Sequence, residues 1–202
     1  MKLKIFLLIA AFVIFSLTAL AQNAKSKTEP LTAGQVAPDF TLTDQNGKAV
    51  TLSKVGKPAI LVFYRGYWCP FCARQLAELR SLLKKDEAVA LFAVSVDPAE
   101  KSKNLAAKIA KDGKGEIDFP LLSDAGHKTI DAYGLFDTGY IGQDVEGIPH
   151  PAVYILDKNR KIVWARVESD YKKRPTNADI RAELDKLSSR FQVPGSKLKS
   201  ST

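Results

Sequence analysis

Two cysteines separated by two residues, between an apolar strand and an amphipathic helix, constrain the fold of this chain more than any other feature. Residues 59–64 (AILVFY) form a continuous apolar run, which predicts a strand buried on both faces. The segment Trp68-Cys69-Pro70-Phe71-Cys72 follows, and Pro70 suits the first position of a helix, so Cys69 lies at its N-terminus. The residues that then recur on one helical face are Cys72, Leu76, Leu79 and Leu83.

The two cysteines are expected to differ in reactivity. Unpaired backbone N–H groups and the helix dipole stabilise a thiolate at Cys69, whereas burial on the inward face keeps the Cys72 thiol protonated. Such a pair can cycle between dithiol and disulfide. A purely structural disulfide is one alternative, although a bridge that closes so short a loop stabilises little. Half of a zinc site is another, but there is no second Cys-x-x-Cys and the only histidines are His127 and His150.

The rest of the chain alternates predicted strands with predicted helices. Asn46-Gly47 between alternating segments indicates a hairpin. Asp97 is expected to cap a helix that ends at Gly113, and Thr176 begins a capping box before the last helix. The other expected elements are strands at 89–96, 119–122, 153–156 and 162–167, and helices at 124–133 and from 177 through Ile180, Leu184, Leu187 and Phe191. This order predicts one layered α/β domain with a mixed sheet.

The N-terminus has the pattern of an export signal. Lys2 and Lys4 precede an uncharged stretch, and Ala19-Leu20-Ala21 offers a cleavage site, so residues 1–21 are predicted to be a cleaved signal peptide. An uncleaved membrane anchor formed by residues 5–20 is the alternative. Residues 22–32 are expected to form a flexible tether, 33–190 the domain and 191–202 a polar tail. The mature protein is then periplasmic or secreted, where disulfides persist.

The net charge of +8 does not by itself indicate a nucleic-acid partner. The basic residues are scattered along the chain, as on an ordinary solvated surface, so no nucleic-acid binding is expected. The basic loop Tyr171-Lys172-Lys173-Arg174 is interpreted in the same way, with a site for an acidic partner as the alternative.

Three segments carry a resemblance to a known family. Gly34 to Thr43 (GQVAPDFTLT), Phe63-Tyr64-Arg65-Gly66 before the cysteines, and Pro151 to Asp157 resemble the AhpC/TSA family, the peroxiredoxin-like branch of the thioredoxin superfamily. The resemblance implies a thioredoxin-like three-layer fold, in which a mixed central sheet with an N-terminal hairpin is flanked by helices. It also implies that Cys69 is the nucleophile and Cys72 its partner. Pro151 would be a cis-proline facing them, with backbone groups free to pair with a substrate.

The sequence departs from the family pattern around the cysteines. Typical members carry Pro-x-x-x-Thr-x-x-Cys, and their threonine holds the peroxide together with an arginine from the late strand. Here Val62 and Gly66 stand at the proline and threonine positions, and Pro151 stands where the arginine would fall. Arg65 is a candidate to stabilise the Cys69 thiolate, although an arginine at a strand end is commonly just solvated.

Four further residues have candidate roles. Trp68 is expected to shield the disulfide and contact substrate, or simply to pack on the domain. His150 is a candidate general base or metal ligand, or an exposed loop residue. Trp164 is expected in the core, and Asp97 is assigned no chemistry beyond its cap.

Together these features predict an exported thiol oxidoreductase. Cys69 attacks a peroxide or a disulfide, Cys72 closes an intramolecular disulfide, and an external thiol donor, either thioredoxin-like or a membrane electron donor, reduces it again. No cofactor is expected. One alternative is a copper chaperone that uses Cys69, Cys72 and His150, because soft thiolates suit Cu(I). The other is an inert binding module with a permanent disulfide.

Overall fold

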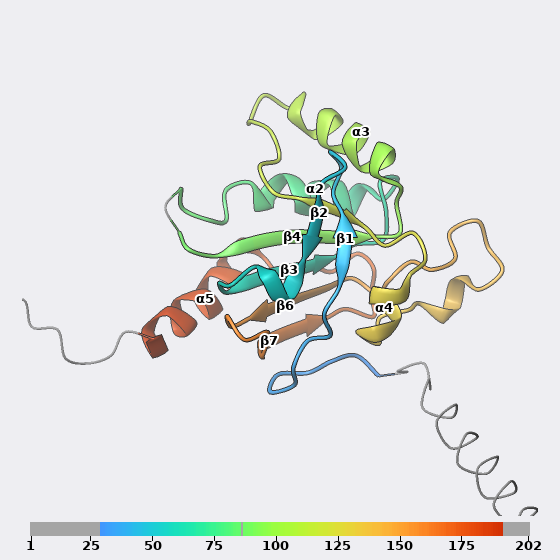
Figure 1. Cartoon of the computed structure of the whole chain (residues 1–202). Coiled ribbons are helices and arrows are strands. Elements are labelled where there is room, and N and C mark those ends of the chain that lie inside the picture. The colour runs from blue at the N-terminus through green and yellow to red at the C-terminus, as the bar shows by residue number, and fades with distance from the viewer. Residues whose placement is uncertain (1–28, 86, 192–202) are drawn as a thin grey trace, which may run out of the picture.

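A seven-stranded mixed sheet forms the centre of the protein (Figure 1). The computed structural model describes residues 29–85 and 87–191, so the expected leader and nearly all of the expected tail lie outside the described residues. The strand order is β2-β1-β5-β4-β3-β6-β7. The strands are β1 (Thr41–Thr43), β2 (Ala49–Thr51), β3 (Ala59–Phe63), β4 (Ala90–Ser95), β5 (Leu121–Ser123), β6 (Ala152–Leu156) and β7 (Ile162–Val167). The helices are α2 (Pro70–Leu79), α3 (Ala99–Ala110), α4 (Lys128–Ala132) and α5 (Asn177–Phe191), with 3₁₀ turns η1 (Leu52–Lys54) and η2 (Thr138–Tyr140).

The central strands are buried on both faces, as their continuous apolar runs predict. β3 pairs in parallel with β4 and antiparallel with β6, and every residue of these three strands is buried. Alternate side chains of β3 enter two separate cores. Ile60 and Val62 pack with α2, α3 and α5, whereas Leu61 and Phe63 pack with η1, α4 and the N-terminal segment. The result is the expected three-layer arrangement.

The folded part of the chain begins before residue 33. Leu31, within the segment expected to be a tether, is buried, and its N–H donates to the Tyr133 carbonyl.

The N-terminal hairpin is confirmed: β1 and β2 pair antiparallel around the Asn46-Gly47 turn, where Gly47 has φ 82°. β1 also pairs with β5, so the hairpin forms one edge of the main sheet. Trp164, on β7, is half-buried against the core beneath α2 and α5.

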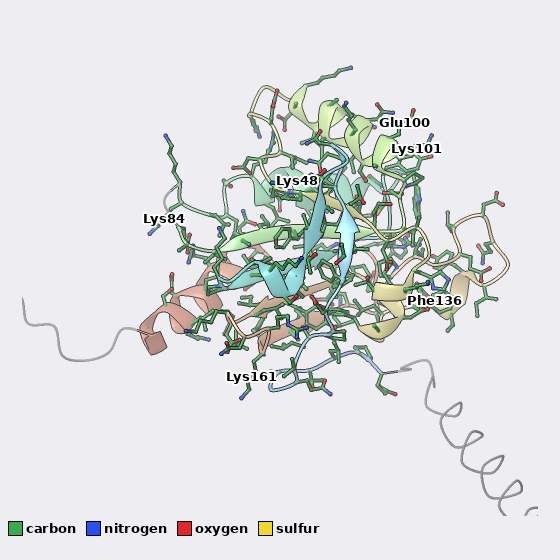
Figure 2. All side chains as sticks on the ribbon, in the orientation of Figure 1. Lys48, Lys84, Glu100, Lys101, Phe136 and Lys161 are labelled. Atoms are coloured by element: carbon green, nitrogen blue, oxygen red, sulfur yellow. The ribbon has the colours of Figure 1, made fainter. Side chains whose placement is uncertain are left out.

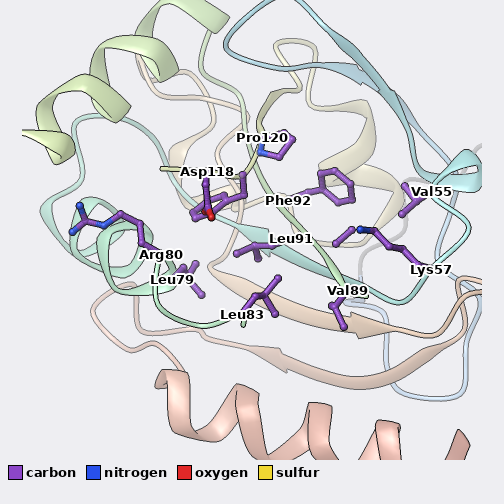
Figure 3. Close-up of a pocket in the computed structure, with 12 residues that line it drawn as sticks. Val55, Lys57, Leu79, Arg80, Leu83, Val89, Leu91, Phe92, Asp118 and Pro120 are labelled. Atoms are coloured by element: carbon purple, nitrogen blue, oxygen red, sulfur yellow. The ribbon is translucent and has the colours of Figure 1, made fainter. Parts of the chain in front are cut away.

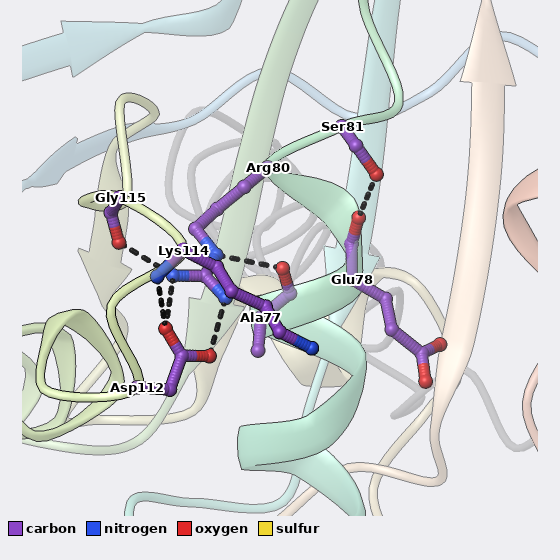
Figure 4. Close-up of polar contacts among 7 residues, drawn as sticks. All are labelled: Ala77, Glu78, Arg80, Ser81, Asp112, Lys114 and Gly115. Carbon is purple, nitrogen blue, oxygen red and sulfur yellow. Dashed lines mark hydrogen bonds and ion pairs between the residues drawn. The ribbon is translucent and has the colours of Figure 1, made fainter.

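Helix α2, which begins at the cysteine pair, is anchored at its far end. Arg80 is its C-cap residue, and its guanidinium makes two hydrogen bonds to the Asp112 carboxylate and one to the Gly115 carbonyl beyond α3 (Figure 4). The Arg80 side chain also donates to the Ala77 carbonyl within α2, at 2.8 Å. The helix ends at Leu79, so Leu83 lies beyond it and not on its inward face as expected, although its side chain packs against the same core.

Helix α3 begins one residue later than the sequence suggests. Its N-cap is Pro98, and the N-cap makes no side-chain hydrogen bond, so the expected capping role of Asp97 is wrong. The capping box of α5 is confirmed, because the Thr176 N–H donates to Asp179 Oδ2 and the Asp179 N–H donates to Thr176 Oγ1.

One surface groove lies away from the cysteines. A groove of about 310 Å³ is lined by residues that include Val55, Lys57, Val89 and Phe92, at the amino ends of β3 and β4 (Figure 3). The labelled Lys48, Lys84 and Lys161 project from separate parts of the surface (Figure 2). Among the described residues, no helix is long and apolar enough to cross a membrane.

Candidate active site

The cysteine pair lies at the carboxyl end of β3, where α2 begins. Cys69 is the N-cap residue of α2 and Pro70 is at its first position, as the sequence predicts. The Ala73 N–H donates to the Cys69 carbonyl at 3.0 Å, which closes the first helical turn. Both cysteines are free thiols and both are buried, Cys69 being 1% exposed. The structure is therefore that of the reduced pair, with the reacting sulfur almost out of contact with solvent.

The two thiols have opposite pKa shifts. The Cys72 thiol donates a hydrogen bond to the Cys69 sulfur, and this bond is the main reason that the pKa of Cys69 is lowered to about 6. Burial opposes the shift, while the positive charges of Arg174 and Arg65 add to it. The same hydrogen bond, together with burial, raises the pKa of Cys72 well above its usual range. Cys69 is thus a thiolate near neutral pH and Cys72 a protonated donor.

Arg174 contacts the pair from a loop that the sequence assigned to solvent. Its Nη2 donates to Cys72 Sγ at 3.3 Å and its Nε donates to Gln75 Oε1 at 2.9 Å. The interpretation of this loop as a solvated surface is therefore wrong for Arg174, whereas Tyr171, Lys172 and Lys173 are exposed as expected. The contact joins residues 102 positions apart, so no local sequence pattern could indicate it.

Arg65 is also buried rather than solvated, with 4% of its surface exposed. Its guanidinium carbon lies 5.0, 4.9 and 4.5 Å from the ring centroids of Trp68, Tyr140 and Tyr171. These cation–π contacts stabilise the buried charge only in part, because Arg65 Nε has no hydrogen-bond partner. Arg65 thus supplies a desolvated positive charge near Cys69, which supports the candidate role over the solvated alternative.

Position 66 requires a glycine because two neighbouring side chains leave no room there for a Cβ atom. A Cβ atom at this position would lie 2.8 Å from Trp68 Nε1 and 3.1 Å from Asp97 Oδ1. Asp97 Oδ2 accepts from the Tyr67 N–H at 2.7 Å and from Ser95 Oγ at 3.0 Å, and burial raises the pKa of this carboxyl. The carboxylate that the sequence assigned to a helix cap therefore positions the turn before Cys69. Trp68 and Asp97 occupy the space that a threonine would need.

The expected cis-proline is wrong. The backbone of the described residues contains no cis peptide bond, so Pro151 follows a trans bond, which X–Pro sequences favour by about 0.5–1 kcal/mol. The Pro151 carbonyl accepts from the Glu168 N–H at 2.9 Å, and the His150 N–H donates to the Leu135 carbonyl at 2.7 Å. These backbone groups are already paired within the fold and are not free to bind a substrate strand.

His150 faces Asp137 rather than the cysteines. Its Nδ1 lies 3.9 Å from Asp137 Oδ2. Within residues 29–85 and 87–191, no three His, Cys, Asp or Glu side chains come together as a metal site. The donor set that the copper alternative requires is therefore not assembled in this conformation.

Comparisons with known proteins identify the family of the chain. A sequence model described as the AhpC/TSA family matches residues 33–165. Peroxiredoxin Q from the chloroplast of Sedum lineare is 33% identical over 152 residues, covering 69% of this chain and 75% of its own. Peroxiredoxin Bcp of Escherichia coli is 31% identical over 137 residues, covering 66% and 83%.

Solved structures show the same fold. Peroxidoxin BcpB from Mycobacterium tuberculosis matches with a TM-score of 0.62 and 24% identity, over 79% of this chain and 95% of its own. Peroxiredoxin 6 of Arenicola marina matches with a TM-score of 0.70 and 20% identity, over 80% and 76%. The chain therefore belongs to the AhpC/TSA family, within the thioredoxin superfamily, and is a peroxiredoxin-like, thiol-dependent oxidoreductase.

Proposed function

We propose that this protein reduces hydroperoxides by a two-cysteine cycle. The Cys69 thiolate attacks the terminal oxygen of the hydroperoxide, the O–O bond breaks, and the departing alkoxide takes a proton to leave as an alcohol or water. Cys69 is then a sulfenic acid. Cys72 attacks that sulfur, the S–O bond breaks, and water and the intramolecular disulfide form. An external dithiol donor, either thioredoxin-like or a membrane electron donor, restores the reduced pair.

One observation favours a hydroperoxide over a protein disulfide as the substrate of Cys69. Cys69 is stabilised as a thiolate while only 1% exposed. A hydroperoxide needs to bring one small oxygen atom to this sulfur, whereas a protein disulfide must bring a sulfur flanked by two chains. The pairing of the His150 N–H and the Pro151 carbonyl within the fold supports the same choice, since neither group is free to bind a substrate strand.

The position of Cys72 supports the second half of the cycle. Its thiol already contacts the Cys69 sulfur through a hydrogen bond, and the two residues share the first turn of α2. The disulfide can therefore form without unwinding the helix, so the sulfenic acid is short-lived and protected from further oxidation.

The peroxide rate of the folded protein tests this proposal. In stopped-flow experiments that follow tryptophan fluorescence, the reduced protein is mixed with hydrogen peroxide, and Cys69→Ser serves as the blank. Ionisation alone makes a thiol with a pKa of about 6 roughly 30-fold more reactive than an ordinary thiol at about pH 7. We expect the folded protein to exceed the urea-unfolded chain by well over this factor. A ratio at or below it would contradict peroxidase function and leave disulfide exchange.

We also propose that the protein acts outside the cytoplasm, on the basis of the charged and apolar pattern of residues 1–21. When the full chain is produced in a bacterium, mass spectrometry is expected to find a mature N-terminus at Gln22 in the exported fraction. Ala21→Arg, which places a large charged residue at the cleavage site, should leave the precursor uncut. Recovery of the wild-type chain in the cytosol with its leader intact would contradict this prediction.

A further inference from the structure

We propose that Arg174 is a third catalytic residue beside Cys69 and Cys72, and that it activates the Cys72 thiol for its attack on oxidised Cys69. This inference rests on the two-cysteine cycle proposed above and assigns to one residue the step that closes the disulfide. Nothing in the local sequence marks Arg174, which lies in the loop between β7 and α5.

The geometry holds the guanidinium of Arg174 in place on the sulfur of Cys72. Its Nη2 donates to Cys72 Sγ at 3.3 Å, and its Nε donates at 2.9 Å to Oε1 of Gln75, a buried residue one turn further along α2. Nη1 donates to the carbonyl groups of Tyr171 and Lys173, at 2.7 and 2.6 Å. A guanidinium fixed by four acceptors cannot easily leave the sulfur, and it keeps its positive charge at any pH the protein meets.

The charge on Cys69 changes during the cycle, and this change alters what Arg174 does. In the reduced protein the Cys69 thiolate opposes ionisation of Cys72, and burial adds to that opposition. Oxidation converts the thiolate to a neutral sulfenic acid. The groups that then face Cys72 are this sulfenic acid, the buried neutral phenol of Tyr64, the main chain of Arg65 and the Arg174 guanidinium. Arg174 is the positive charge among them, and it favours the Cys72 thiolate.

The step balances without any further reactant. As the Cys72 thiol loses its proton, its sulfur lone pair forms the S–S bond to Cys69 and the S–O bond of the sulfenic acid breaks. The departing hydroxide takes up one proton, so the products are the disulfide and water. Arg174 stays protonated throughout and contributes only its charge and its hydrogen bond. The same guanidinium favours the Cys69 thiolate first and, once that charge is gone, the Cys72 thiolate, so it promotes peroxide reduction and disulfide closure in turn.

Rapid-quench kinetics tests the proposal. The reduced protein is mixed with one equivalent of hydrogen peroxide, and the sulfenic acid is trapped with a cyclic dione and measured by intact mass. In Arg174→Gln the sulfenic acid should form more slowly, because Arg174 also favours the Cys69 thiolate, and it should then persist. Closure should be about 10- to 100-fold slower near neutral pH, because loss of an adjacent cation raises a thiol pKa by about one to two units. The deficit should shrink as pH rises, and Arg174→Lys should recover part of the rate. Lys173→Gln, which removes an exposed charge from the same loop, should close at the wild-type rate.

A direct titration separates this inference from the proposed function. In Cys69→Ser a neutral hydroxyl replaces the thiolate, so the ultraviolet absorbance of the Cys72 thiolate can be followed against pH without any peroxide. Adding Arg174→Gln, or Arg174→Lys if the glutamine variant does not fold, should raise the pKa of Cys72, with the lysine variant the less affected. An unchanged pKa, or a closure rate that falls equally at every pH, would overturn the role of Arg174. Failure of wild-type Cys69 to react with peroxide would instead overturn the proposed function and leave the titration result standing.

Discussion

Replacing Cys72 by alanine is expected to raise the pKa of Cys69 from about 6 toward the ordinary thiol value of about 8.5. The hydrogen bond from the Cys72 thiol is the main cause of the low value, and alanine has no donor to replace it. At about pH 7 the thiolate fraction, and with it the rate of peroxide attack, should fall by roughly 10- to 30-fold. Turnover should also stop after one oxidation, because no second thiol can close the disulfide.

Cys72→Ser is the matched control, since its hydroxyl can still donate to the Cys69 sulfur. Both variants lose the disulfide, but only alanine loses the donor. A lowered pKa means that the thiolate is present above that pH, so the wild-type oxidation rate should rise through about pH 6 and then level off. The serine variant should level off closer to the wild type, and the alanine variant at higher pH. Identical profiles for the two variants would show that the hydrogen bond does not set the pKa of Cys69.

Gly66→Thr, which installs the side chain found at this position in typical family members, is expected to damage the site rather than improve it. Its Cβ would lie 2.8 Å from Trp68 Nε1 and 3.1 Å from the Asp97 carboxylate. Overpacking of this kind costs about 1–3 kcal/mol of unfolding free energy. Asp97 accepts a hydrogen bond from the Tyr67 N–H in the turn before Cys69. Displacement of the Asp97 carboxylate should therefore also slow the attack of Cys69 on peroxide, by about tenfold or more.

Urea unfolding and stopped-flow oxidation of the same samples measure the two effects of Gly66→Thr. Gly126→Ala is the control, because a Cβ at that position meets no atom within 4 Å and the backbone there is not in the left-handed region. It should change neither stability nor rate noticeably. A threonine variant as stable and as fast as the wild type would mean that Trp68 and Asp97 are not fixed by their contact with Gly66.

The parts of the site that could be predicted from the sequence depend on local patterns. The position of Cys69 at the start of α2 follows from an apolar run, a proline and helical spacing within about one turn, and each of these signals is contiguous. Burial of Cys72 follows from the same spacing. A layered α/β domain with a mixed sheet was predictable for the same reason, since alternating strands and helices leave few ways to bury both faces of a sheet. The three-layer thioredoxin-like fold came from the family resemblance.

The parts that could not be predicted depend on contacts between distant segments. Arg174 reaches Cys72 across 102 positions, and a run of basic residues in a loop has the same composition whether it is solvated or folded over a site. Asp97 before a proline matches a capping pattern, but its carboxylate is taken by the Tyr67 N–H 30 positions earlier. At Pro151 the analogy with thioredoxins predicted the wrong peptide isomer, because the isomer of an X–Pro bond depends on the surrounding fold and no local sequence signal reports it.

The anchoring of α2 by Arg80 has a practical consequence. The helix begins at the cysteine pair and is tied at its other end to Asp112 and Gly115, so its C-terminal end cannot move without breaking three hydrogen bonds. Lys57 is exposed at the amino end of β3, whereas the cysteine pair follows the carboxyl end of that strand. Attaching the protein to a surface through residue 57 should therefore leave the cysteine pair undisturbed, so that its thiol chemistry can be measured on immobilised protein.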